Sequence, residues 1–147
     1  DPKEPEVVLR TRVFVLQPER REVLPDELGR LVVRRAATLE IELEAKLKRP
    51  ISHARLTLPR PCGVELVRSP RLFNGPVAIE QHDDAIHFFI DHWDRGTHTV
   101  RFVVKPEFSG TLSSPPPELA PMYSDTHPTA VFAPARWIVK EQGPAEK

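Results

Sequence analysis

The sequence has little cysteine, little glycine and no excess of charge of either sign. Cys62 is the single cysteine among 147 residues, so no internal disulfide can form. Lys plus Arg total 21 and Asp plus Glu total 21, so the formal net charge is zero. This balance offers no general electrostatic basis for binding nucleic acid or an anionic membrane. No nucleic-acid partner is therefore expected.

Long hydrophobic runs and known catalytic motifs are also missing. No stretch of roughly 18 apolar residues occurs, so we expect no membrane insertion. No signal-peptide pattern is found, and the polar start without Met indicates a trimmed or processed segment. No catalytic residues are predicted, so the sequence favours a protein that is not an enzyme.

Proline is abundant, with 17 residues against only 6 glycines. Its spacing near ten residues suits short strands with rigid connections and excludes long helices over most of the chain. The sequence therefore predicts an all-β fold, an antiparallel β-sandwich of about seven to nine short strands, with a small barrel as the alternative. Residues 7–140 are expected to form this single domain, after a flexible leading segment 1–6 and before a polar tail 141–147.

Alternating polar and apolar residues mark the predicted strands. The clearest alternation runs from Thr38 to Leu47, where glutamates and a lysine face away from the apolar side chains. A second strand is predicted from Gly96 to Lys105. A third, Val7–Leu16, changes phase near Thr11, which favours a β-bulge there. Gln17–Gly29 is charged and contains two prolines, and its part Pro25–Gly29 is expected to be a turn with at most one helical turn.

Histidine, cysteine and tryptophan residues invite functional hypotheses. Four of the six histidines stand near aspartates, but their spacing matches no zinc motif, so no metal and no cofactor are expected. Cys62 lies in a proline corner and fits no nucleophile signature. The sequence Cys62–Glu65 differs from an internal thioester because Glu65 stands where a Gln is required. Trp93 and Trp137 are expected in the core or at its rim.

The stretch from Gly96 to Tyr123 carries a resemblance to a known family. It combines an acidic turn and glycine, a strand with an Arg-Phe-Val-Val centre, a glycine turn, three prolines and a final Met-Tyr pair. It resembles the C-terminal macroglobulin-like domain of bacterial alpha-2-macroglobulin family proteins. The corner from Leu58 to Glu65 is similar to a proline-rich corner of that family. The resemblance covers residues 30–140 and implies a macroglobulin-like, fibronectin-III-like sandwich.

The resemblance implies a non-catalytic domain of a protease inhibitor. Family members are large periplasmic or secreted traps that capture an attacking protease through a reactive thioester. Their macroglobulin-like domain packs on the thioester domain, which would be the direct partner of this chain. The target protease would be an indirect partner. The thioester-shielding or interdomain contact would fall to Met122 and Tyr123, with Pro115, Pro116 and Pro117 stiffening the approach. The sequence departs from the family pattern at 124–128, directly after the tyrosine.

The alternative hypothesis is a free-standing β-sandwich for adhesion or ligand binding. In that case Trp93, Trp137 or the histidine-rich turns would form the site. It predicts a concave pocket with convergent polar groups away from Met122.

Overall fold

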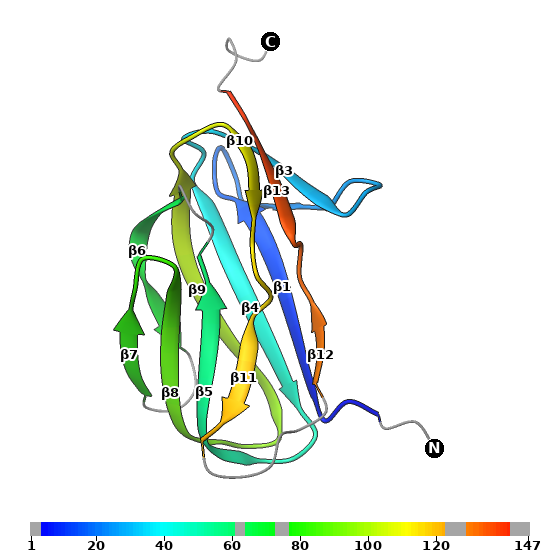
Figure 1. Cartoon of the computed structure of the whole chain (residues 1–147), viewed down its shortest axis with the longest axis vertical. Coiled ribbons are helices and arrows are strands. Elements are labelled where there is room, and N and C mark those ends of the chain that lie inside the picture. The colour runs from blue at the N-terminus through cyan, green and yellow to red at the C-terminus, as the bar shows by residue number, and fades with distance from the viewer. Residues whose placement is uncertain (1–3, 61–63, 73–76, 123–128, 142–147) are drawn as a thin grey trace.

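The computed structural model describes residues 4–60, 64–72, 77–122 and 129–141. These ranges contain thirteen β-strands and no helix (Figure 1). The strands are β1 Val7–Val15, β2 Arg21–Val23, β3 Arg30–Arg34, β4 Leu39–Leu47, β5 Ile51–Pro59, β6 Val64–Leu72, β7 Val77–Gln81, β8 Ala85–Trp93, β9 Gly96–Pro106, β10 Gly110–Ser113, β11 Glu118–Pro121, β12 Thr129–Phe132 and β13 Arg136–Lys140. Across the described ranges, nothing helical could cross a membrane.

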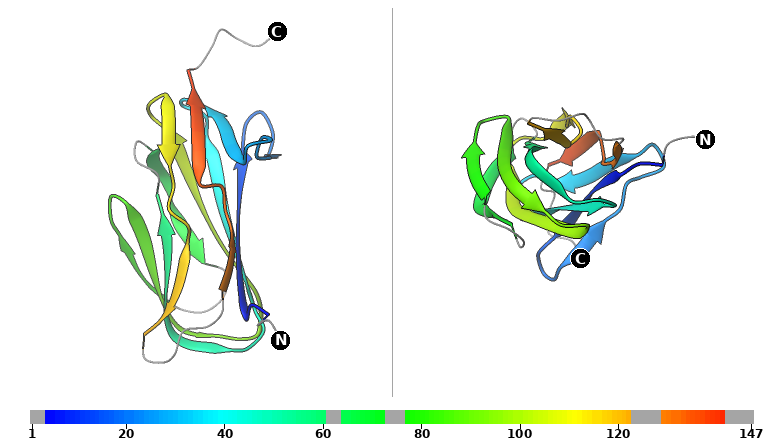
Figure 2. Two further views of the ribbon diagram at one scale, coloured as in Figure 1. Left: turned by 45° about the vertical axis from the view of Figure 1, so that its right-hand side comes forward. Right: turned by 90° about the horizontal axis from the view of Figure 1, so that it is seen from below.

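The strands form two layers. One layer is a sheet in the order β12-β1-β4-β9-β6, with β2 beside β1. The other layer holds two smaller sheets, β11-β5-β8-β7 and β10-β13-β3, one above the other along the long axis (Figure 1, Figure 2). Most pairings are antiparallel, and β1–β12 and β13–β3 are parallel. The prediction of an all-β sandwich is confirmed, with more strands than expected.

Two segments of the chain change sheets, and prolines mark both places. After β10 pairs with β13, the chain passes through Pro115–Pro117 and continues as β11, which pairs with β5. After β12 pairs with β1, it passes Pro134 and continues as β13. Proline has no backbone N–H to donate to a ladder, so it ends the first pairing and frees the chain for the second. The Ser114 N–H donates to the Ala135 carbonyl at 2.9 Å and joins the two switch points.

The core lies between the layers and is lined by alternate residues of each strand. In β4, Leu39, Ile41, Leu43, Ala45 and Leu47 are all buried, as the sequence pattern predicted. The same side of the sheet meets Phe88, Trp93 and Trp137 from the opposite layer. Alternation therefore identified the buried face of this strand.

The outer face of the large sheet explains one wrong prediction. β1 pairs with β4 in continuous register from Val7 to Val15, so the bulge expected near Thr11 is absent. The phase change arises because Phe14 is buried on the outer face, where the Arg20 guanidinium lies 3.7 Å from its ring centre. Glu42 is also only 8% exposed, and Arg101 donates to it at 2.8 Å.

Other boundaries differ in detail from the sequence-based expectation. The turn expected over Pro25–Gly29 contains no helix, and the segment before it contains β2, which the sequence pattern did not indicate. The sequence predicts a strand from Ala85 to Ile90, which the structure extends to Trp93 as β8. The final strand predicted over 130–139, with a break at Pro134, is present as β12 and β13. Residues 69–76 favour a loop with Asn74-Gly75 as the turn at its tip. That turn lies outside the described residues, whereas β6 reaches Leu72.

Candidate functional site

Met122 is the described member of the predicted Met-Tyr contact. Met122 is 48% exposed, and its backbone N–H donates to the His53 carbonyl at 2.8 Å. His53 has a left-handed backbone, with φ of 54°, where β5 is irregular. The main chain at Met122 is therefore anchored while its side chain faces solvent. Tyr123 lies outside the described residues.

The three prolines do not lead directly to Met122. The strand β11 intervenes, pairing Glu118 with Thr57 and Pro121 with Ala54, so the expected long loop is partly a strand. Pro117 is buried, whereas Pro115 and Pro116 are exposed. Pro115 and Pro117 border a small hollow of about 30 Å³ next to Phe102 and Trp137. This proline segment therefore covers one end of the core and also connects β10 to β11.

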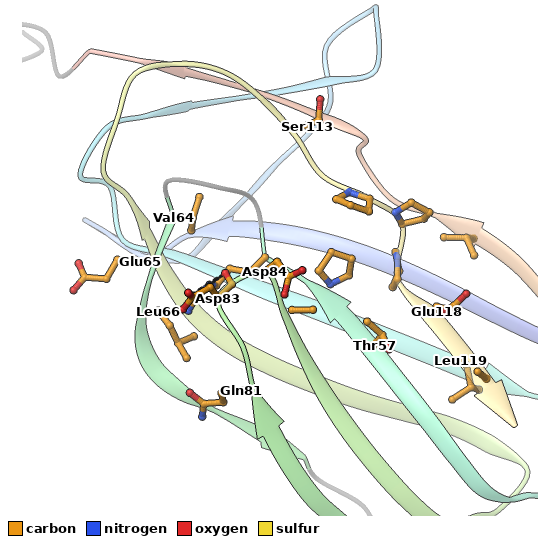
Figure 3. A pocket seen from close by; sticks show the side chains of 18 of the residues that line it. Thr57, Val64, Glu65, Leu66, Gln81, Asp83, Asp84, Ser113, Glu118 and Leu119 are labelled. Carbon is orange, nitrogen blue, oxygen red and sulfur yellow. Dashed lines mark hydrogen bonds between the residues drawn. The ribbon is translucent and has the colours of Figure 1, made fainter. Parts of the chain in front are cut away.

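A larger cleft lies on the other side of the proline segment (Figure 3). Its volume is about 1530 Å³. In Figure 3 the turn between β7 and β8 brings Asp83 and Asp84 to its centre, with Val64–Leu66 of β6 on one side and Leu119 of β11 on the other. All three expected contact prolines, Pro115, Pro116 and Pro117, line this cleft.

Negative charge predominates among the described residues of the cleft. The lining carries five carboxylates and one guanidinium: Glu65, Asp83, Asp84, Glu107, Glu118 and Arg60. The Arg60 guanidinium donates to the Asp83 backbone carbonyl at 3.0 and 3.2 Å and does not pair with a carboxylate there. Within the described part of the chain, none of the five carboxylates forms an ion pair or a hydrogen bond. The cleft therefore combines apolar walls with these unpaired carboxylates.

The histidines take part in local contacts between strands. Ser52 Oγ and His92 Nδ1 are 3.0 Å apart, and His92 Nε2 lies 2.7 Å from Asp94 Oδ1. His98 is buried, stacks on Trp93 with ring centres 4.5 Å apart, and bonds the Asp94 carbonyl at 2.8 Å. These contacts join the ends of β5, β8 and β9. Among the described residues, no group of three or more His, Cys, Asp or Glu side chains is arranged to hold a metal ion.

The aromatic residues proposed for a ligand-binding alternative lie in the core. Trp93 is 1% exposed and Trp137 is 2% exposed, so neither offers a face to a ligand. This confirms their expected core position. Cys62, which fits no nucleophile signature, lies outside the described residues. Sequence reasoning did not find the cleft, because its residues come from six separate stretches of the chain between Thr57 and Val131.

Comparison with known proteins points to one family. The family model described as "Bacterial Alpha-2-macroglobulin MG10 domain" matches residues 11–125. The expectation of a C-terminal macroglobulin-like domain is wrong in its position, because the matching model describes the MG10 domain. A comparison with curated protein sequences finds no match.

Solved structures share this fold. Native alpha-2-macroglobulin from Escherichia coli, spanning domain MG7 to the C-terminus, aligns with a TM-score of 0.69 and 15% identity over 95% of this chain and 24% of that chain. Trypsin-activated alpha-2-macroglobulin from Escherichia coli gives 0.67 and 14% over 95% and 11%. A non-cellulosomal cohesin from Archaeoglobus fulgidus gives 0.56 and 6% over 94% and 92%. The chain thus spans about a tenth to a quarter of these macroglobulins, and at such identities the likeness establishes the fold.

Proposed function

Because this chain belongs to the family of bacterial alpha-2-macroglobulin MG10 domains, we propose that it is a non-catalytic packing domain of a larger protease inhibitor. In this proposal it packs on the thioester domain of the same parent chain, in the periplasm or outside the cell. Its surface excludes water from the thioester until a target protease triggers rearrangement.

The observation that carries the proposal is the presentation of Met122. Its side chain is half exposed on a backbone that is anchored to His53 and preceded by a paired strand. An apolar, adaptable thioether suits contact with another folded domain, and the anchored backbone beneath it has little further entropy to lose on docking. Tyr123 is proposed to share this contact. Pro115 and Pro116 would border it, and Pro117 would hold the segment against the core.

The test is the lifetime of the thioester in the intact parent. We expect Met122→Ser to increase the rate of free-thiol release at least about tenfold, a change of about 1.4 kcal/mol in the barrier to hydrolysis. Release is followed with a thiol-reactive dye in the absence of protease. Val67→Ser is the matched control, because Val67 is 47% exposed on a different strand. Equal rates in the two variants, or a parent without a thioester, would leave only a packing role.

A further inference from the structure

The acidic cleft combines apolar walls with the free edges of two strands. β11 is an edge strand of the four-stranded sheet, and β12 is an edge strand of the large sheet. Each therefore has a side on which no described strand pairs. Leu119 and Ala120 of β11 and Val131 of β12 line the cleft together with prolines. An unpaired strand edge offers backbone N–H and C=O groups to an added extended segment. The cleft therefore has the features of a site for an extended polypeptide.

The carboxylates of the cleft differ from several others on the molecule, which are paired. Asp26 pairs with Arg30 at 2.8 Å, Glu42 with Arg101 at 2.8 Å, and Glu141 with Arg35 at 3.1 Å. The five carboxylates of the cleft have no such partners within the described ranges, and Arg60 is the single cationic residue among the described lining residues. Like charges gathered at a concave, partly apolar surface attract a cationic partner and repel an anionic one.

We propose that this cleft binds an extended, basic polypeptide segment, whose lysines or arginines meet the carboxylates while its alternate apolar side chains contact the proline walls. The volume of about 1530 Å³ exceeds the roughly 300–1000 Å³ typical of small-molecule pockets. Five wall residues are prolines, at positions 59, 115, 116, 117 and 121. They present apolar surface without N–H donors, so backbone pairing falls to the strand edges. The proposal goes beyond shielding of a thioester and does not depend on it.

The probe is a six-residue peptide of alternating valine and lysine, titrated into the 147-residue chain and followed by amide chemical shifts. We expect shift changes at Leu119, Ala120 and Asp84, and weaker binding as salt is raised. Asp83→Asn combined with Asp84→Asn should raise the Kd at least about tenfold, since two charge pairs are lost. Asp83 and Asp84 are exposed turn residues, so the amide spectrum should otherwise be retained.

The matched control is Glu19→Gln combined with Glu22→Gln. Both glutamates are exposed, lie outside the cleft lining and change the net charge by the same amount. We expect the control to alter the Kd less than about twofold, a shift that long-range charge alone can explain. Equal weakening by both double variants would overturn the proposal. It would also be overturned by equal binding of a valine–glutamate peptide, by equal competition from spermidine, or by shift changes located outside the cleft. None of these results depends on whether the parent carries a thioester.

Discussion

At the residue scale, Asp26 organises the loop between β2 and β3. One of its carboxylate oxygens accepts the N–H groups of Leu28 and Arg30 at 2.9 and 2.8 Å, and the other accepts Arg30 Nε at 2.8 Å. Gly29 completes the turn with φ of 76°, a conformation that favours glycine. The backbone N–H and then the side chain of Arg30 hold the pKa of Asp26 below its ordinary value of 3.8. The charged form of this carboxylate therefore stabilises the folded state.

This lowered pKa predicts how the stability should depend on pH. Because the folded-state pKa is the lower one, the contribution of Asp26 is complete above the ordinary value and is lost as pH falls through the lowered value. Asp26→Asn should therefore lower the melting temperature at pH 7 and flatten its decline below about pH 4. Thermal unfolding followed by circular dichroism between pH 7 and pH 2 measures both effects. Glu27→Gln, an exposed neighbour in the same loop, is the control. An unchanged slope in Asp26→Asn would contradict the assignment.

At the scale of elements, the proline segment acts as the connection between two sheets. It ends the pairing of β10 with β13 and begins that of β11 with β5, while Pro117 is buried at the junction. Its stiffness reduces the number of unfolded conformations at the place where the chain must change partners.

Two matched substitutions distinguish how much the packing and the stiffness of this segment each contribute to stability. Pro117→Ala should lower the free energy of unfolding by about 1.5–3 kcal/mol, because it loses both buried contacts and rigidity. Pro116→Ala, at an exposed position, should cost only about 0.4–1 kcal/mol through the unfolded state. Urea unfolding of both variants provides the comparison. Equal losses would mean that Pro117 contributes no packing.

The sequence predicted the elements whose signal is local and missed those that depend on distant partners. Period-two alternation identified β4 and its buried face because one side meets the core. The three-residue strand β2 shows too little alternation to detect, and it exists because Val13 to Val15 offers it an edge. Likewise, the sequence of β11 favours a loop, because three prolines precede it and Pro121 ends it, and only its pairing with β5 makes it a strand. The cleft was missed for the same reason: pairing across the chain creates it.

At the scale of the whole molecule, the last two described strands close the sandwich. β12 covers the edge of β1, and β13 lies between β10 and β3. β13 also brings Trp137 and Val139, which are 2% and 3% exposed, into the core. A fold in which the end of the chain completes both layers depends on contacts between residues far apart in sequence.

A truncation tests this dependence directly. A chain ending at Pro128 should lose cooperative unfolding, because removal of Trp137 alone is worth about 3–5 kcal/mol against a total stability of roughly 5–15 kcal/mol. A chain ending at Glu141 keeps every described strand and should melt cooperatively. Differential scanning calorimetry distinguishes the two. A sharp transition in the shorter chain would show that β12 and β13 are dispensable.

The parallel pairing of β1 with β12 has a mechanical consequence. The start of β1 and the end of β13 lie at opposite ends of the long axis (Figure 1). A force that pulls these two points apart drags β1 one way and β12 the other, along their common direction. The four residue pairs from Val7–Thr129 to Arg10–Phe132 would then have to slide past one another at the same time. The parallel pairing of β13 with β3 adds a second ladder in the opposite layer. Such shear resists rupture more strongly than opening a ladder pair by pair, so this fold would transmit tension from one end of its long axis to the other without unravelling.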